Sequence, residues 1–144
     1  MQVKDVAGSS GRSVVTVEPS ETIADVVDLL KEHSIGAIVV SEDGKSIDGI
    51  ISERDVVRHL AREQEGTLRV PVEDLMTRSV LTCRLDDDLE ATMRIMTDGH
   101  FRHMPVVDSN NALSSIVSLG DLVGARLQAL EAQNNELQER TAGN

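Results

Sequence analysis

Gly49-Ile50-Ile51-Ser52-Glu53-Arg54-Asp55 decides the fold of this chain, because the sequence repeats its pattern as Ser115-Ile116-Val117-Ser118-Leu119-Gly120-Asp121. In both stretches two β-branched residues run into a serine, and an aspartate follows that serine three positions later. An apolar run that ends in Ser-x-x-Asp predicts a strand followed at once by a helix whose first turn the serine and the aspartate cap. The same turn collects unpaired N–H groups at the positive end of a helix dipole, where anions such as phosphate bind. A helix cap and an anion-binding turn are therefore both open interpretations of each stretch.

The two stretches belong to an internal repeat. Shifted by 66 residues, the distance between the two aspartates, the sequence stays in register with itself without a gap from Arg12 onward. A short lead-in at residues 3–6 also repeats, at 72–75 and with a shift of 69, because the loop at 8–11 is longer by three residues in the first copy. Copies of about 60 residues bury little apolar surface alone, so we expect the two to share one core.

Each copy is predicted to form a strand, a helix, two strands joined by a turn and a second helix. The elements of the first copy are a strand at 14–17, a helix capped by Ser20, strands at 37–40 and 47–51, and a helix from Ser52. Those of the second copy are a strand at 80–83, a helix capped by Asp86, strands at 104–107 and 113–117, and a helix from Ser118. The expected fold class is therefore α/β in the broad sense of a mixed fold, and within it the α+β arrangement of strands and helices. We divide the chain into a first repeat with its lead-in at 1–66, a second repeat at 67–125 and a C-terminal helix at 126–144.

Composition narrows the class of protein. The formal net charge of −11 argues against a nucleic-acid partner, since binding to a phosphate backbone relies on lysine and arginine. The N-terminus lacks an apolar signal region, and no apolar run approaches the roughly 20 residues that a membrane span needs. One cysteine, Cys83, cannot form an internal disulfide, so we expect a reducing, cytoplasmic setting.

The sequence contains no arrangement typical of catalysis. We find no Ser-His-Asp ordering, no paired acid and base carboxylates and no Walker-type phosphate loop. Cys83 matches Val17 of the first copy, which indicates a core residue rather than a nucleophile. His100 and His103 would face opposite sides of an extended segment, so a shared metal is not expected. We therefore expect a binding module with no catalytic residue and no metal site.

The order of these motifs resembles a known family. Each copy combines an apolar lead-in strand, a stretch such as Phe101-x-x-Met104-Pro105-Val106-Val107-Asp108, a polar turn, and Gly-Ile-Ile-Ser-x-x-Asp or its counterpart. Together they resemble the cystathionine-β-synthase (CBS) domain, and the tandem resembles a CBS pair, or Bateman module, over about residues 1–125. The resemblance implies two β-α-β-β-α repeats that are related by a pseudo-twofold axis and packed sheet to sheet, here with a C-terminal helical extension. It also implies that two pairs associate into a flat disc.

The resemblance further implies binding of an adenosine compound, either AMP, ADP, ATP or S-adenosylmethionine, in clefts between the repeats. The aspartate of Ser-x-x-Asp would take the ribose hydroxyls, and the serine would lie near phosphate. These roles fall on Asp55 with Ser52, and on Asp121 with Ser118. Arg54 adds a cation beside the first motif, whereas the second motif has no cation there.

The residues before the second strand rank the two clefts. Arg102 and His103 stand where family members that hold phosphate often place basic side chains, and their counterparts in the first copy are Gly36 and Ala37. We therefore favour the cleft that would combine Arg102 and His103 with the second motif, although Arg102 could also be an ordinary surface residue. The nucleotide-binding residues expected in this cleft are Thr82, Arg102, His103, Met104, Pro105, Ser118 and Asp121. Those expected in the other cleft are Thr16, Ile35, Gly36, Ser52, Arg54 and Asp55.

The C-terminus carries a heptad pattern that the family core does not require. Successive positions lie 4, 3, 4 and 3 residues apart, with Leu127 and Asn134 at a, and with Val123, Leu130 and Leu137 at d. Asn at one a position fixes a two-stranded register, and Arg126 at g could pair with Glu131 at e in a parallel coiled coil. Such a seam favours a homodimer. A lone amphipathic helix packed on its own domain is the alternative.

Two functions fit these expectations. In the first, the protein is a non-catalytic regulatory sensor whose adenosine ligand changes the geometry of a homodimer that an unknown effector protein reads. In the second, it is a structural or stress-related dimeric scaffold whose clefts stay empty. Neither function calls for a required cofactor, a nucleic acid or a membrane.

Overall fold

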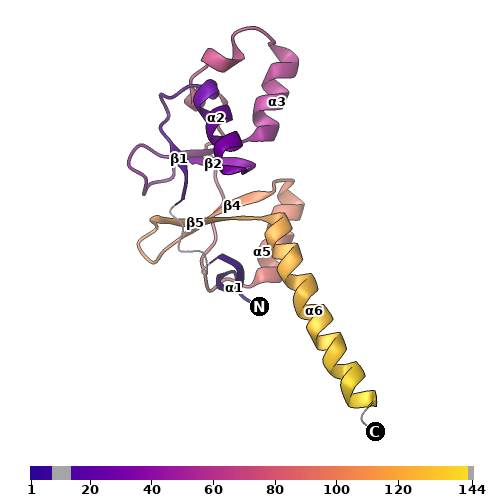
Figure 1. Ribbon diagram of the computed structural model, residues 1–144. Coiled ribbons are helices and arrows are strands. Elements are labelled where there is room, and N and C mark those ends of the chain that lie inside the picture. Colours follow the sequence, from indigo (N-terminus) through magenta and orange to yellow (C-terminus); the bar gives the residue numbers. More distant parts are fainter. Residues whose placement is uncertain (8–13, 143–144) are drawn as a thin grey trace.

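Two β-sheets face one another at the centre of the molecule, and helices cover the outer side of each (Figure 1). The computed structural model describes residues 1–7 and 14–142, so the loop that holds the expected insertion, together with Arg12, lies outside the described residues. The first sheet has the order β1-β2-β3 and consists of β1 (Thr16–Val17), β2 (Ala37–Val40) and β3 (Gly49–Ser52). The second sheet consists of β4 (His103–Val107) and β5 (Leu113–Ser118). Strand β1 runs parallel to β2, and the two hairpins β2-β3 and β4-β5 are antiparallel.

Each sheet carries the helices of its own repeat. The first repeat contributes α2 (Ile23–His33) and α3 (Glu53–Arg62), and the second contributes α5 (Leu89–Gly99) and α6 (Leu119–Ala142). Shorter helical turns are α1 (Lys4–Ala7), η1 (Thr67–Arg69) and α4 (Val72–Leu75). The predicted fold class, two repeats of mixed strands and helices followed by a C-terminal helix, is confirmed.

The strand expected at 80–83 is wrong, because only an isolated parallel bridge forms there, between Cys83 and Val106. The Cys83 amide donates to the Pro105 carbonyl at 3.0 Å, and the Cys83 carbonyl accepts from the Val107 amide at 2.9 Å. The preceding bond of a parallel ladder would need an N–H from residue 105, and proline has none. The first repeat has Val39 at this position, and there β1 forms.

The first helix of each repeat begins later than expected. Thr22, not Ser20, caps α2, and Asp88, not Asp86, caps α5, so both predicted caps are wrong. In each repeat a turn with a backbone hydrogen bond of 3.1 Å precedes the helix and takes up the residue that was expected to cap it. Serine and aspartate favour both turns and caps, so composition alone does not separate the two positions.

The helix that follows the first Ser-x-x-Asp motif begins as predicted. The Asp55 amide donates to Ser52 Oγ at 3.3 Å, and the Ser52 amide donates to Asp55 Oδ2 at 2.8 Å, which completes a capping box. In the second motif the Asp121 amide donates to Ser118 Oγ at 3.1 Å, but no reciprocal bond to the Asp121 carboxylate occurs within the described residues. The two motifs therefore differ in how firmly the aspartate side chain is held.

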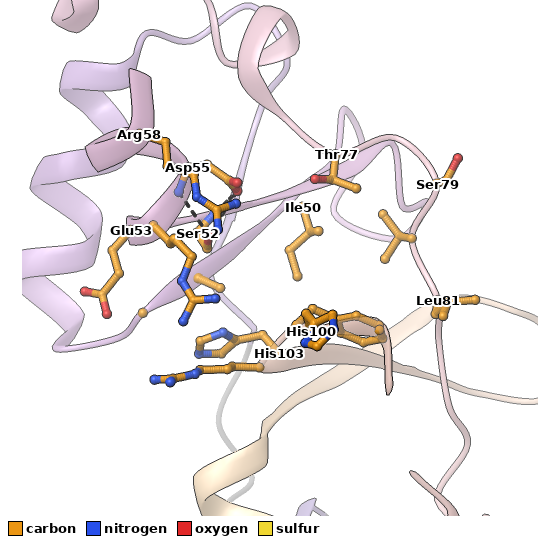
Figure 2. Close-up of a pocket in the computed structure, with 17 residues that line it drawn as sticks. Ile50, Ser52, Glu53, Asp55, Arg58, Thr77, Ser79, Leu81, His100 and His103 are labelled. Carbon is orange, nitrogen blue, oxygen red and sulfur yellow. Dashed lines mark hydrogen bonds between the residues drawn. The ribbon is translucent and has the colours of Figure 1, made fainter. Parts of the chain in front are cut away.

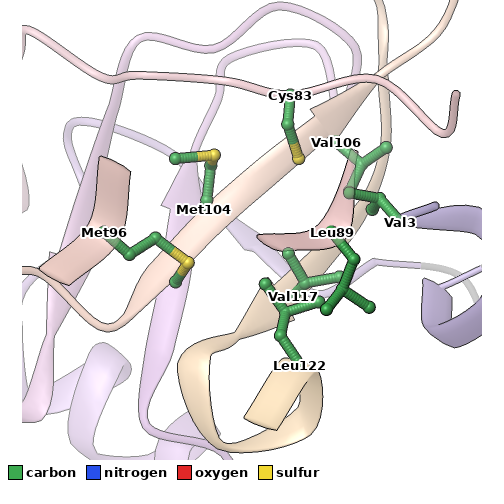
Figure 3. Close-up of a cluster of buried hydrophobic side chains, with 8 residues drawn as sticks. All are labelled: Val3, Cys83, Leu89, Met96, Met104, Val106, Val117 and Leu122. Atoms are coloured by element: carbon green, nitrogen blue, oxygen red, sulfur yellow. The ribbon is translucent and has the colours of Figure 1, made fainter. Parts of the chain in front are cut away.

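Each repeat has a hydrophobic cluster of its own, so the expected single core is wrong. The alternation of side chains along a strand explains this. Ile38 and Val40 belong to the first cluster, so the buried Val39 between them points toward the other sheet. By the same alternation, His103 and Pro105 point inward from the second sheet. Figure 3 shows the second cluster, which contains Val3, Cys83, Leu89, Met96, Met104, Val106, Val117 and Leu122.

The two lead-ins are exchanged between the repeats. Val3 is fully buried in the cluster of the second repeat, where its amide donates to the Asp87 carbonyl at 3.0 Å (Figure 3). Val72 is fully buried in the cluster of the first repeat, where its amide donates to the Glu21 carbonyl at 2.8 Å. The sequence groups each lead-in with the repeat that follows it, whereas the structure packs each on the other repeat. This exchange ties the two repeats together.

Helix α6 continues well beyond the body of the molecule (Figure 1). Residues 131–141 are exposed, so this half of the helix does not pack on its own domain. Arg126, expected at a g position, pairs with Glu90 of α5 at 2.7 Å within the same chain. In the described part of the chain no helix combines the length and the apolar character that crossing a bilayer requires.

Candidate functional site

The candidate site is a cavity of about 400 Å³ between the two sheets, a size that suits a small-molecule ligand (Figure 2). One wall comes from the first repeat: Gly36, Ala37, Ile50, Ser52, Glu53, Arg54, Asp55 and Arg58. The facing wall comes from the second repeat: Gly99, His100, Phe101, Arg102 and His103. The segment that enters the second repeat closes one end with Thr77, Ser79, Val80 and Leu81.

The first wall presents the start of α3. The Glu53 amide donates to the Gly36 carbonyl at 2.9 Å, and the Asp55 amide donates to Ser52 Oγ. The amide of Arg54 lies between these two and has no acceptor among the described residues. This amide and the positive end of the helix dipole favour an anion at this wall, whereas the carboxylates of Glu53 and Asp55 in the same turn oppose one.

The closed end of the cavity depends on a close backbone approach. Ile50 and Thr77 exchange hydrogen bonds of 3.0 and 2.9 Å between their amides and carbonyls. A Cβ at Gly49 would lie 2.8 Å from the Thr77 carbonyl oxygen, so only glycine permits this approach. The segment held in this way carries the side chains of Thr77 and Leu81 to the edge of the cavity (Figure 2).

The second wall follows the end of α5. His100 ends that helix with φ of 57°, and its amide donates to the carbonyls of Met96 and Thr97. The reversal brings Phe101 back over Gly99, where a Cβ would collide with the ring. Phe101, the only aromatic residue of the chain, thus stands in the cavity together with the apolar side chains at its closed end.

His103 reaches from the second sheet to the first. A Cβ at Gly36 would lie 3.2 Å from the imidazole Cε1 and Nε2, so the absence of a side chain there makes room for the ring. Burial lowers the pKa of His103 from its ordinary value of 6.5, and the nearby Arg102 adds to this, while Glu53 and Asp121 act in the opposite direction. The imidazole is therefore neutral at pH 7 when the cavity is empty.

Three arginines face the cavity without an ion-pair partner in the structure. They are Arg54 and Arg58 from α3, and Arg102 from the second wall. Within the described residues the ion pairs are those of His59 with Glu63 and of Arg126 with Glu90, and neither involves a cavity arginine. Free guanidinium groups concentrated in a chain of net charge −11 indicate a site for an anionic group.

The structure divides the predicted site residues differently from the sequence. Arg102 and His103 line one cavity together with Gly36, Ser52, Arg54 and Asp55 of the first motif. Asp121 lines a different hollow, although it lies near enough to His103 to raise the pKa of that imidazole. His103 lies near both motifs. It lines the cavity with Ser52 and Asp55, and it pairs with Ser118 across the β4-β5 hairpin.

Several other residues predicted for the clefts do not line this cavity. Met104 belongs to the hydrophobic cluster of the second repeat, and Ile35 packs against that of the first. Pro105 is buried in β4, Thr16 lies half-buried in β1, and Thr82 is exposed.

Sequence reasoning missed most of the apolar lining and one cation. Arg58 lies four residues after Arg54, which is one helical turn, so the spacing could have revealed it. Phe101 is the counterpart of Ile35, and the repeat could have pointed to it. Thr77 and Leu81 gave no signal, because their place depends on how the connecting segment crosses the first sheet.

A second hollow lies beside the second motif. It is lined by Asp5, Val6, Ala7, Ser115, Ile116, Val117, Gly120, Asp121, Gly124, Ala125 and Gln128. The counterparts of Arg54 and Arg58 are Gly120 and Gly124, so this hollow has no cation among the residues that line it. In the register of the repeat, the segment that closes the first cavity corresponds to residues at and after position 8, of which 8–13 lie outside the described residues.

Comparison with known proteins finds a family model and solved structures that match this architecture. The CBS domain model matches residues 3–62 and again residues 72–128. The CBS-domain-containing protein ATU1752 from Agrobacterium tumefaciens is 38% identical, with a TM-score of 0.81 over 88% of this chain and 99% of that one. The CBS domain-containing protein YhcV from Bacillus subtilis is 36% identical over 76% of both chains. CBSX2 from Arabidopsis thaliana, solved in complex with AMP, is 27% identical, with a TM-score of 0.77 over 89% of this chain and 97% of that one.

Proposed function

This chain belongs to the CBS domain family, and from that membership and the geometry of the cavity we propose that it is a regulatory module that binds an adenine nucleotide between its two repeats. The observation that carries the proposal is the division of one cavity into an apolar end and a cationic end. Figure 2 shows Leu81 and Ser79 at one end, and Glu53 and Arg58 toward the other.

The two ends match the parts of a nucleotide. At the apolar end, Ile50, Leu81 and Phe101 offer surfaces against which an adenine ring packs, while the hydroxyls of Thr77 and Ser79 offer hydrogen bonds. At the other end, the unpaired Arg54 and Arg102 side chains and the free Arg54 amide offer donors to the oxygens of one phosphate.

Asp55 lies between these ends and takes the ribose in this proposal. One of its carboxylate oxygens, Oδ2, accepts from the Ser52 amide and hydroxyl, at 2.8 and 3.0 Å. The second oxygen remains available to accept from a ribose hydroxyl. The crystallisation of CBSX2 with AMP supports an adenine nucleotide as the ligand class.

The regulatory output is proposed to be a homodimer whose geometry an effector protein reads. The apolar heptad positions of α6 support dimer formation, because Leu127, Leu130 and Leu137 are 54%, 42% and 57% exposed. Two such helices in parallel would cover these side chains and bring the Asn134 residues together.

A capping aspartate outside the cavity provides a matched control for the test. Asp25 completes the capping box that Thr22 begins at α2, just as Asp55 completes the box at α3, but Asp25 does not line the cavity. We expect Asp55→Asn and Asp25→Asn each to cost about 1 kcal/mol of stability. Only Asp55→Asn should weaken AMP binding, by about tenfold or more, in a calorimetric titration.

The alternative is a scaffold with empty clefts, and the same experiment separates it from a sensor. If none of adenosine, AMP, ADP, ATP and S-adenosylmethionine binds at millimolar concentration, the proposed function is wrong. If AMP binds and both aspartate variants keep the same affinity, the ligand lies elsewhere and Asp55 serves only as a cap.

A further inference from the structure

We propose that α3 carries a second phosphate subsite built around Arg58, so that the first cavity prefers adenine nucleotides with two or three phosphates to AMP. This inference rests on the proposed function and deepens it. It concerns a residue to which the Ser-x-x-Asp motif gives no role.

The placement of Arg58 carries the argument first. Arg54, Arg58 and Arg62 follow one another at four-residue steps, each about 6 Å along the axis of α3, so their side chains leave the same side of the helix. Figure 2 shows Arg58 on the same wall as Ser52 and Asp55, above the opening that His103 bounds from the other sheet. A phosphate chain that starts at the Arg54 amide meets Arg58 next.

A neighbouring hollow leaves room for a longer phosphate chain of the nucleotide. A hollow of about 600 Å³, lined by residues of α3 and α4, shares Asp55 and Arg58 with the cavity. Arg58 thus borders both spaces. His59 also borders this hollow, but its ring is already held, by Thr67 Oγ1 at 3.0 Å and by Glu63 at 3.5 Å. Arg62 supplies a further cation to the lining of this hollow, and Asp74 supplies a carboxylate.

The repeat supplies an internal comparison. In α6 the counterparts of Arg54, Arg58 and Arg62 are Gly120, Gly124 and Gln128, and all three of these uncharged residues line the hollow beside Asp121. The chain thus keeps the aspartate in both motifs but a row of cations in only one. A structural requirement of the fold would act on both helices, so the row points to a ligand of the first cavity.

The test compares ligands that differ only in the number of phosphates. Adenosine, AMP, ADP and ATP are titrated by calorimetry in the absence of divalent cations, so that each nucleotide keeps its full charge. The proteins are the unmodified chain, Arg58→Gln, and Arg94→Gln as a control for an exposed arginine of α5 that lines neither space. Melting temperatures check that all three proteins fold.

We expect ADP and ATP to bind about tenfold tighter than AMP, because one additional charge-assisted contact is worth about that factor. Arg58→Gln should remove this gain while changing AMP affinity less than about threefold, and Arg94→Gln should change neither. If AMP binds as tightly as ATP, or if Arg58→Gln weakens both ligands equally, the subsite is refuted and the proposed function stands. If no adenosine compound binds, the proposed function fails, and the subsite with it.

Discussion

Replacement of Val3 by alanine is expected to destabilise the protein strongly, although Val3 lies near the start of the chain. Val3 is fully buried in the cluster of the second repeat, together with Cys83, Leu89 and Val106 (Figure 3). Alanine lacks two of the valine carbons, and each buried carbon is worth about 0.8 kcal/mol, or about 1.6 kcal/mol together. The space left behind adds to this cost, so we expect a loss of about 2–3 kcal/mol in the free energy of unfolding.

Urea unfolding, followed by far-UV circular dichroism, measures this loss. Val57→Ala is the matched control, because it removes the same atoms from a side chain that is 62% exposed, and it should change stability by less than about 0.5 kcal/mol. Val72→Ala removes the equivalent side chain of the other lead-in, and its cost should add to that of Val3→Ala within about 0.5 kcal/mol, because the two lie in separate clusters. If Val3→Ala costs no more than Val57→Ala, the exchange of lead-ins between the repeats is refuted.

Three further predictions concern titration and association. Burial holds the pKa of His103 below 6.5, and a phosphate bound nearby should raise this pKa. AMP binding should therefore take up a proton, and AMP affinity should increase as the pH falls toward the His103 pKa. Calorimetry in buffers of different ionisation heat measures the proton uptake, which should be smaller in His103→Gln. Burial and the nearby Asp87 raise the pKa of the Cys83 thiol to about 11, so iodoacetamide at pH 8 should label it in urea and leave it unlabelled in the folded protein. Leu130→Lys with Leu137→Lys should convert a dimer into a monomer in light scattering, and a monomeric parent protein would contradict the proposed coiled coil.

The features that sequence predicted well depend on neighbours in the chain. Ser52 and Asp55 are three residues apart, so their capping box is written in one stretch, and β2 is an uninterrupted apolar run. The strand expected near Cys83 failed for a reason that lies elsewhere, since the N–H that it lacks belongs to Pro105 on the partner strand. The misplaced caps failed because serine and aspartate suit the preceding turn as well as the helix start.

The candidate site was harder to predict, because it is made of contacts between repeats. Arg102 and His103 precede the second motif in the chain, and grouping them with Asp121 follows that order. The pleat of β4 instead points His103 out of its own repeat and toward Gly36 of the facing sheet. No period or spacing within one repeat contains this information, although the missing side chain at Gly36 is the complementary half of the contact.

The two repeats carry their basic side chains at different positions, and the contact across the sheets brings these positions together. Arg54 lies within the first motif and Arg58 follows it, whereas Arg102 and the titratable His103 stand at the start of β4 in the second repeat. They converge only because each repeat supplies one wall to the same cavity. The second motif has glycines at the positions that match Arg54 and Arg58, yet its repeat contributes Arg102 and His103 to the groups that would hold an anion beside Asp55. A repeat whose own motif has no cation can therefore still supply binding residues, and these residues have to be assigned to the motif of the other repeat.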